Sequence, residues 1–274
     1  MFPWAIRAIG TLNRYFAIFR LLVKIGLMQQ MAYRSHFFMM IAGKIIRIGL
    51  LFLFFQAVFL RVDRIGQWSY EQVLLLFATF QIIDYLMSVT FHRNLAFQFP
   101  MRIRNGELDS RMLFPINLLF LVSFERIDVI DFFSFLPSLA FLGYALYRLD
   151  FAFTFTQAVT YAALLVNALA FLYAVVLMIA TVSFWTTQSQ GLARIFDSLL
   201  KVGRYPLDIF GDFFKTVLIY ILPLVLISHL PSQALLQALS PRSVLFAFGA
   251  TTVFLIASAG FWRVGLRNYL SASS

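Results

Sequence analysis

Six stretches of the chain are apolar enough over about 20 residues to cross a lipid bilayer. They lie at 39–60, 71–91, 127–147, 158–183, 214–230 and 243–262. Hydrophobic residues make up 61% of the chain and charged residues only 12%, which is more apolar surface than a water-soluble domain of this size can bury. The sequence therefore predicts an all-α integral membrane protein with six transmembrane helices.

Basic residues are distributed unevenly over the connectors between these spans. Most fall in the N-terminal segment, the C-terminal tail and the two longer connectors, 92–126 and 184–213, whereas the opposite face receives Arg61, Arg64, Arg148 and Arg242. Cytoplasmic loops of membrane proteins carry such an excess of Lys and Arg. We therefore predict that both termini and both longer connectors are cytoplasmic, and that the net charge of +10 reflects topology and not nucleic-acid binding.

Residues 1–36 precede the first span and contain a proline-free segment, 11–34, with polar residues on one side. This pattern predicts a helix that lies on the cytoplasmic membrane surface. A helix buried against other protein is the alternative. The remainder, 37–274, forms the six-helix transmembrane domain.

Motifs for catalysis are not found in the sequence. It contains neither the G-x-x-x-x-G-K-[ST] loop that binds phosphates, nor H-E-x-x-H for zinc, nor G-x-S-x-G for a nucleophilic serine. There is no cysteine, and His36, His92 and His229 match no spacing of metal ligands. We therefore predict no cofactor or metal in this chain and no ATP hydrolysis by it.

The connector between spans two and three contains a compact charged insert, MRIRNGELDSRMLFP, at 101–115. Asn105 can cap a short helix, Glu107 and Asp109 then fall in its first turn, and Pro115 ends it. Leu108 and Met112, four residues apart, would form one small apolar face. The pattern fits either a solvated loop or a docking element for a soluble partner.

Three segments carry a resemblance to a known family. The insert IRNGELDSRMLFP (103–115) resembles the I-R-x-G-E-L-D-x-x-x-L-x-P segment of membrane subunits of bacterial ABC-2-type transporters, in a subgroup related to drug and viologen exporters. GRYPLDIF (203–210) and the tail FWRVGLRNYLSASS (261–274) agree with the same family. Phe114 departs from it, because a basic residue is expected before the proline.

The resemblance implies a permease subunit of an exporter in the bacterial cytoplasmic membrane. Two such subunits, identical or homologous, would form the pathway, and separate ATPase subunits would bind ATP and magnesium. In that family the connector after span two is a coupling helix that inserts into the ATPase. The corresponding residues here are Ile103, Arg104, Asn105, Gly106, Glu107, Leu108, Asp109, Arg111, Met112, Leu113 and Pro115.

Polar residues within the spans suggest a further site. Gln81, Asp84 and Ser88 share one face of the second predicted helix, and a carboxylate there must face a partner helix or a wet cavity. A structural seam and a substrate pathway remain equally open interpretations. Pro223 is expected to bend the fifth span.

A second acidic cluster lies at the cytoplasmic end of span three and contains Glu125, Arg126, Asp128 and Asp131. Pairing of its acids with Arg93 or Arg102 of the connector is favoured over ion binding. Two other functional classes are weighed against the permease. One is an intramembrane enzyme that uses Asp84 with His92, disfavoured because eight helical residues separate them by about 12 Å. The other is a non-transporting membrane scaffold or lipid scramblase.

Overall fold

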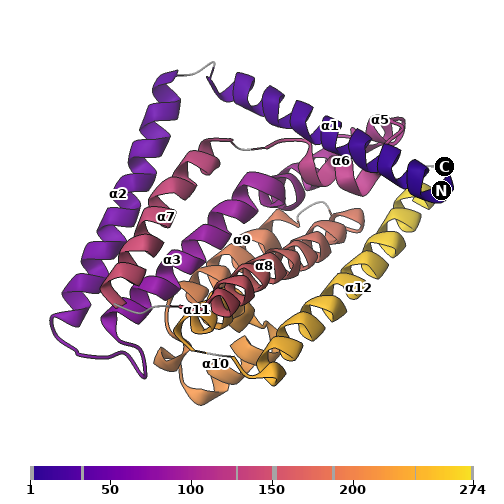
Figure 1. The fold of residues 1–274 in the computed structure, drawn as a ribbon. Coiled ribbons are helices and arrows are strands. Elements are labelled where there is room, and N and C mark those ends of the chain that lie inside the picture. The colour runs from indigo at the N-terminus through magenta and orange to yellow at the C-terminus, as the bar shows by residue number, and fades with distance from the viewer. Residues whose placement is uncertain are drawn as a thin grey trace.

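The computed structural model describes residues 3–31, 34–127, 129–149, 153–186, 189–237 and 239–272, and within them the chain is helical (Figure 1). The first half comprises α1 (Pro3–Met31), α2 (Arg34–Phe59), α3 (Tyr70–Met87), the π-helical segments η1 (Ser88–His92) and η2 (Asn94–Gln98), α4 (Phe99–Arg104), α5 (Leu108–Met112), α6 (Leu118–Phe124) and α7 (Val129–Leu149). The second half comprises α8 (Phe155–Thr181), η3 (Val182–Phe184), α9 (Gln190–Leu200), η4 (Lys201–Arg204), η5 (Leu207–Ile209), α10 (Asp212–Thr216), η6 (Val217–Ile221), η7 (Leu224–Leu226), α11 (His229–Leu236) and α12 (Pro241–Ala272).

Four helices in the described part of the chain are long and apolar enough to cross a membrane. They cover Phe38–Phe59, Tyr70–His92, Phe155–Phe184 and Pro241–Tyr269. These match the predicted spans 39–60, 71–91, 158–183 and 243–262. The predicted span 127–147 coincides with α7, whose apolar portion Phe135–Leu149 is shorter.

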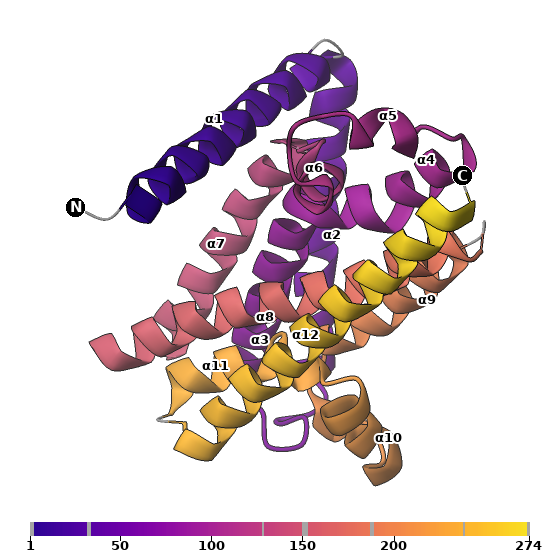
Figure 2. The same ribbon diagram turned by 90° about the vertical axis from the view of Figure 1, so that its right-hand side faces the viewer.

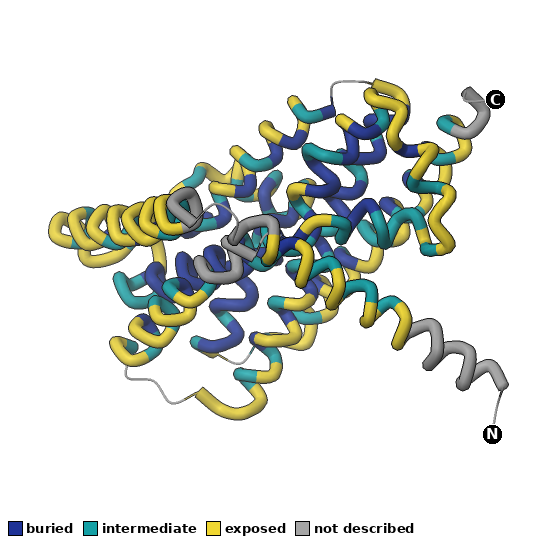
Figure 3. Tube along the Cα trace, turned by 90° about the horizontal axis from the view of Figure 1, so that it is seen from above, coloured by how far each residue is buried: buried dark blue, intermediate teal, exposed yellow. Residues whose placement is uncertain are grey.

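The centre of the bundle is α3, which α2, α7, α8 and α11 surround (Figure 1). Its side chains from Val73 to Ile83 are all buried, and all of them except Thr79 and Gln81 are apolar. A helix of this kind is stable only inside a bundle or in lipid. Figure 3 shows the buried residues concentrated in the middle of the molecule, with the N-terminal helix projecting from it.

The predicted fifth span, 214–230, is wrong. The structure divides this stretch among α10, η6, η7 and the start of α11. The helix does not merely bend at Pro223 as expected: it ends at Leu222, whose ψ of 78° is not helical, and Pro223 lies between η6 and η7. A proline cannot donate the backbone hydrogen bond that would continue the helix.

The segment that runs along α3 is instead the preceding one, which consists of α9 and η4. Gln190 Nε2 donates to the Phe97 carbonyl oxygen at 3.1 Å, while a Cβ on Gly203 would lie 3.4 Å from the Phe80 ring. The run from 190 to 204 is therefore antiparallel to α3. Apolar residues on one side of α9, Ala193 and Phe196 among them, are buried.

The charge pattern predicted that the whole connector 184–213 lies at one end of the molecule, and the structure shows that it does not. Its second half reaches the turn between α2 and α3, where the Leu207 N–H donates to His229 Nε2 at 2.9 Å and His229 meets the Trp68 ring edge-on. Gly66 in that turn has a φ of 60°, and a Cβ there would lie 2.5 Å from Asp208 Cβ. The charged residues of α9 explain the error, because they lower its hydropathy.

The opposite end of the bundle carries α1, which begins at Pro3, earlier than the predicted 11–34 (Figure 2). Arg14 Nη2 donates to the Pro115 carbonyl oxygen at 3.0 Å, and the Tyr15 ring meets Phe120 edge-on at 4.8 Å. Phe16 and Met28 on α1 are exposed. The location of α1 on the membrane surface stays a prediction, with which these exposed apolar side chains are compatible.

The C-terminal helix α12 packs against α8 at a glycine. A Cβ on Gly265 would lie 2.5 Å from the Phe184 ring and 2.9 Å from Thr181 Cγ2. Trp262, one turn earlier, is buried against Phe99 and Phe184. The close approach of the two helices thus depends on the missing side chain at 265.

Replacing Gly265 with alanine should lower the free energy of unfolding by about 1 to 3 kcal/mol, because the added methyl overpacks this contact. Gly260→Ala is the matched control: a Cβ there meets nothing within 4 Å, and alanine favours the helix. Thermal unfolding of both variants in the same detergent provides the measurement. Equal melting temperatures would show that the α8–α12 contact tolerates a side chain at 265.

Candidate functional site

The charged insert follows a continuous helical run from Tyr70 to Arg104. Asn105 does not cap the next helix, as the sequence suggested, but forms the C-cap of α4. Gly106 follows with a φ of 68°, a left-handed conformation that favours glycine, and reverses the chain. Helix α5 then starts at Leu108 with Glu107 as its N-cap, and Asn105 Nδ2 donates to Glu107 Oε1 at 3.3 Å.

The apolar pair in α5, Leu108 and Met112, faces the helical bundle. Leu108 is fully buried, and Met112 packs partly buried against the core. The outward side of the insert carries Leu113, 85% exposed, and Phe114, 54% exposed. The predicted apolar face of Leu108 and Met112 is therefore present, but the bundle itself covers it.

Glu125, at the end of α6, binds two arginines of the insert and holds it in place. Its Oε2 and Oε1 accept from Arg111 Nε and Nη2, each at 3.2 Å, and it also forms an ion pair with Arg102. Burial lowers the pKa of Arg102, and the charge of Glu125 opposes that shift. One carboxylate thus joins α4, α5 and α6.

The rest of the predicted acidic cluster does not share this site. Arg126 is exposed, and its backbone carbonyl accepts from Asn94 Nδ2 at 2.7 Å. Asp128 lies outside the described residues, as does the side chain of Asp131. The predicted pairing with Arg102 is confirmed for Glu125, and the structure adds Arg111, which the sequence did not indicate.

A second connection joins the insert to the C-terminal helix. Tyr269 OH on α12 donates to Asp109 Oδ1 on α5 at 2.7 Å. Asp109 was expected to lie in the first turn of a helix and to belong to the coupling element, and its contact with α12 was not predicted. Because α12 also packs on α8, this hydrogen bond links the insert to two membrane-spanning helices at once.

The polar face of α3 lies toward α2 and η4. Gln81 is buried and donates from Nε2 to Tyr85 OH at 3.5 Å, while Asp84 and Ser88 are half-buried. Asp84 interacts electrostatically with two arginines, Arg47 on α2 and Arg204 on η4.

These arginines were missed as members of the site, because Arg47 lies within the first predicted span and Arg204 within the connector 184–213 that was predicted to be cytoplasmic. Arg204 stacks over the Phe80 ring, 5.2 Å from its centroid, and therefore lies partway along α3. One signal in the sequence could have drawn attention to Arg204. It lies in GRYPLDIF (203–210), one of the three segments that carry the family resemblance.

The intramembrane-enzyme interpretation is not supported by the geometry. His92 Nε2 lies 2.7 Å from Asp197 Oδ1 on α9, so its hydrogen bond goes to a different carboxylate from Asp84. This pair ties the end of η1 to α9 and accounts for both side chains structurally.

The long apolar helices and these sites define a multi-pass helical membrane protein. The family described as ABC-2 family transporter protein matches residues 45–273. The chain belongs to this family and is a membrane permease subunit of the ABC transporter class, a kind of protein that works with ABC ATPase subunits. No curated protein matches the chain.

Glu125→Gln should destabilise the protein by about 3 kcal/mol, because Arg102 would remain buried without its counter-charge. Arg126→Gln is the control, since it alters an exposed neighbour. Thermal unfolding and limited proteolysis between residues 104 and 115 are the measurements. Wild-type stability and proteolysis of Glu125→Gln would mean that the ion pairs do not hold the insert in place.

Proposed function

We propose that this chain is the permease subunit of an ABC exporter and that Asn105–Leu113 is its coupling element. Two subunits, identical or homologous, form the pathway, and separate ATPase subunits bind ATP and magnesium. The chain crosses the bacterial cytoplasmic membrane six times, with α9 and η4 as the fifth crossing. Both termini and the insert are cytoplasmic, in agreement with the basic residues around them.

One observation carries the coupling assignment. The insert is rigidly attached on its inner side and exposes an apolar pair, Leu113 and Phe114, on its outer side. Exposed apolar side chains on a short, well-anchored element are typical of a docking surface for soluble protein. Arg104, Glu107 and Ser110 of the same insert are exposed as well, and they would supply polar contacts beside that pair.

The attachments of the insert support a mechanical role. Glu125 connects it to α6 and through α6 to the third span, while Tyr269 connects it to α12. Arg14 of α1 donates a hydrogen bond to Pro115, the last residue of the insert, and Tyr15 accepts one from the backbone N–H of Asn117 just beyond it. Movement of an ATPase bound at Leu113 would therefore be delivered to several helices together.

In this account residues 1–36 form a separate interfacial element, and 37–274 form the transport domain. The matched family region starts at residue 45 and so leaves out α1. The exposed apolar side chains of α1 would insert into the headgroup region while its polar side faces water.

Leu113→Asp should reduce ATPase binding by about tenfold or more, because it places a charge in the centre of the proposed contact. Leu60→Asp is the matched control: Leu60 is 79% exposed and lies at the opposite end, which a cytoplasmic ATPase does not reach. The measurement is the amount of ABC ATPase, quantified by mass spectrometry, that copurifies with an affinity-tagged permease from native membranes.

Equal recovery of the ATPase with both variants would contradict the coupling assignment. Absence of any ABC ATPase from the wild-type preparation would instead favour the non-transporting scaffold or scramblase.

A further inference from the structure

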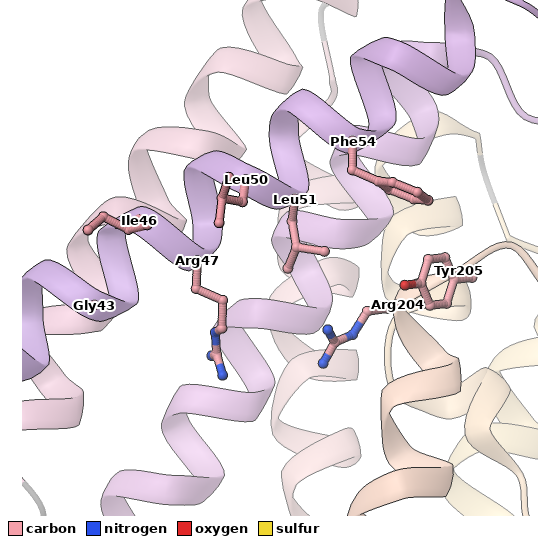
Figure 4. Close-up of a pocket in the computed structure, with 8 residues that line it drawn as sticks. All are labelled: Gly43, Ile46, Arg47, Leu50, Leu51, Phe54, Arg204 and Tyr205. Carbon is pink, nitrogen blue, oxygen red and sulfur yellow. The ribbon is translucent and has the colours of Figure 1, made fainter.

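An open pocket of about 470 Å³ lies between α2 and the η4 segment (Figure 4). This volume falls within the range of small-molecule sites. Figure 4 shows Arg47 and Arg204 extending from opposite walls into the same gap. Apolar side chains complete the α2 wall, namely Ile46, Leu50, Leu51 and Phe54, and none of the described residues that line the pocket is acidic.

Each of the two guanidinium groups has a contact that holds it in place. Neither contact is with a carboxylate of a described residue that lines the pocket. Arg47 Nη2 donates to Tyr85 OH at 3.3 Å. Arg204 stacks on Phe80, and its Nε is buried without a hydrogen-bond partner among the described residues. A buried charged donor in this state is costly unless a further acceptor reaches it.

The surrounding charges leave the pocket electropositive. Asp84 lies behind it on α3 and acts on both arginines, so one carboxylate faces two cations. Asp197 is paired with His92, and it precedes Arg204 by seven residues, about 10 Å along a helix. Lys44, one turn before Arg47, lies over the Tyr85 ring and adds to the positive side.

The pocket also has a distinct apolar part. Ile46 and Leu50 are 61% and 60% exposed, and Phe54 is 49% exposed. Leu50 and Phe54 continue along α2 from Arg47 toward the turn between α2 and α3, whereas Ile46 precedes Arg47. A ligand that satisfies the whole pocket must therefore carry a negative group beside an apolar body.

We propose that this pocket binds an amphipathic anion, with its carboxylate or phosphate between Arg47 and Arg204 and its apolar body along Leu50 and Phe54. An acidic bilayer lipid and an apolar organic anion share this chemistry. The arginines donate charge-assisted hydrogen bonds to the acidic group, and Arg204 Nε gains the acceptor that it lacks. Binding requires neither the ATPase nor the coupling role of the insert.

The absence of cysteine allows a direct test with Leu51→Cys in the pocket wall. The permease is placed in phosphatidylcholine nanodiscs, and the rate of thiol labelling is measured with increasing dodecanoate or dodecyltrimethylammonium. Dodecanoate should slow the labelling, whereas the cation should not. Adding Arg47→Gln and Arg204→Gln together should raise the protecting concentration by about tenfold or more. Arg194→Gln, an exposed arginine on α9, is the control and should change nothing.

Nanodiscs of phosphatidylglycerol distinguish the two sources of the anion. Slow labelling there without added dodecanoate would identify an acidic lipid as the occupant. Labelling that still responds to dodecanoate would identify an organic anion. Either result supports the proposal, since both place an acidic group between the arginines.

Three results would overturn it: equal protection by the cation, unchanged protection in a stably folded double glutamine variant, or a disulfide between the cysteines of two subunits, which would place a second copy over the pocket. If the glutamine variant does not fold, Arg47→Lys with Arg204→Lys keeps both charges and should retain protection. Loss of selectivity for the anion in a folded lysine variant would likewise contradict the proposal.

Discussion

Glu125 binds two arginines that come from different elements, and the position of the charged insert depends on that interaction. Without it, Arg102 would be buried as an uncompensated charge, and α5 would depend on the packing of Leu108 and Met112 and on the Tyr269 hydrogen bond. With it, a segment of soluble-like composition is fixed to the end of an apolar bundle. The insert is therefore rigid on its inner side and free for contact on its outer side.

The three segments that resemble ABC-2 permeases have separate structural reasons. In 103–115, Gly106 reverses the chain with a positive φ and Arg111 reaches Glu125. In 203–210, the Gly203 carbonyl accepts from Ser228, and Asp208 lies against Gly66.

In the tail, Gly265 lets α12 approach Phe184, while Tyr269 binds Asp109. The first and last of these segments meet at one end of the bundle. The middle one lies along α3, and its second half extends to the opposite end.

Hydropathy alone was sufficient to predict four spanning helices, because each contains a long apolar run, and it also gave the position of α7, whose apolar portion is shorter. It failed for α9, since Arg194, Asp197 and Lys201 make this segment resemble a connector even though Ala193 and Phe196 are buried. It failed again at 214–230, where composition favours a span but Pro223 interrupts the backbone.

Local patterns in the insert predicted a short helix but not its surroundings. The spacing of Leu108 and Met112 showed that they share a face, yet nothing in the sequence indicated that the bundle covers that face. The choice of Asn105 as a cap failed because Gly106 places the start of α5 later. In the same way, Arg47 and Arg204 are distant in sequence, and their convergence depends on the return of α9 along α3.

The central claim is that the insert and α12 move as one unit when the ATPase acts. Spin labels at Ser110→Cys on α5 and Arg263→Cys on α12, both exposed sites, allow the distance between these helices to be measured by pulsed electron resonance in the permease–ATPase complex. We expect this distance to be the same with and without ATP, while the distance from Ser110 to a label at Leu60 changes. A Ser110–Arg263 distance that shifts as much as the Ser110–Leu60 distance would contradict a rigid connection through Tyr269 and Asp109.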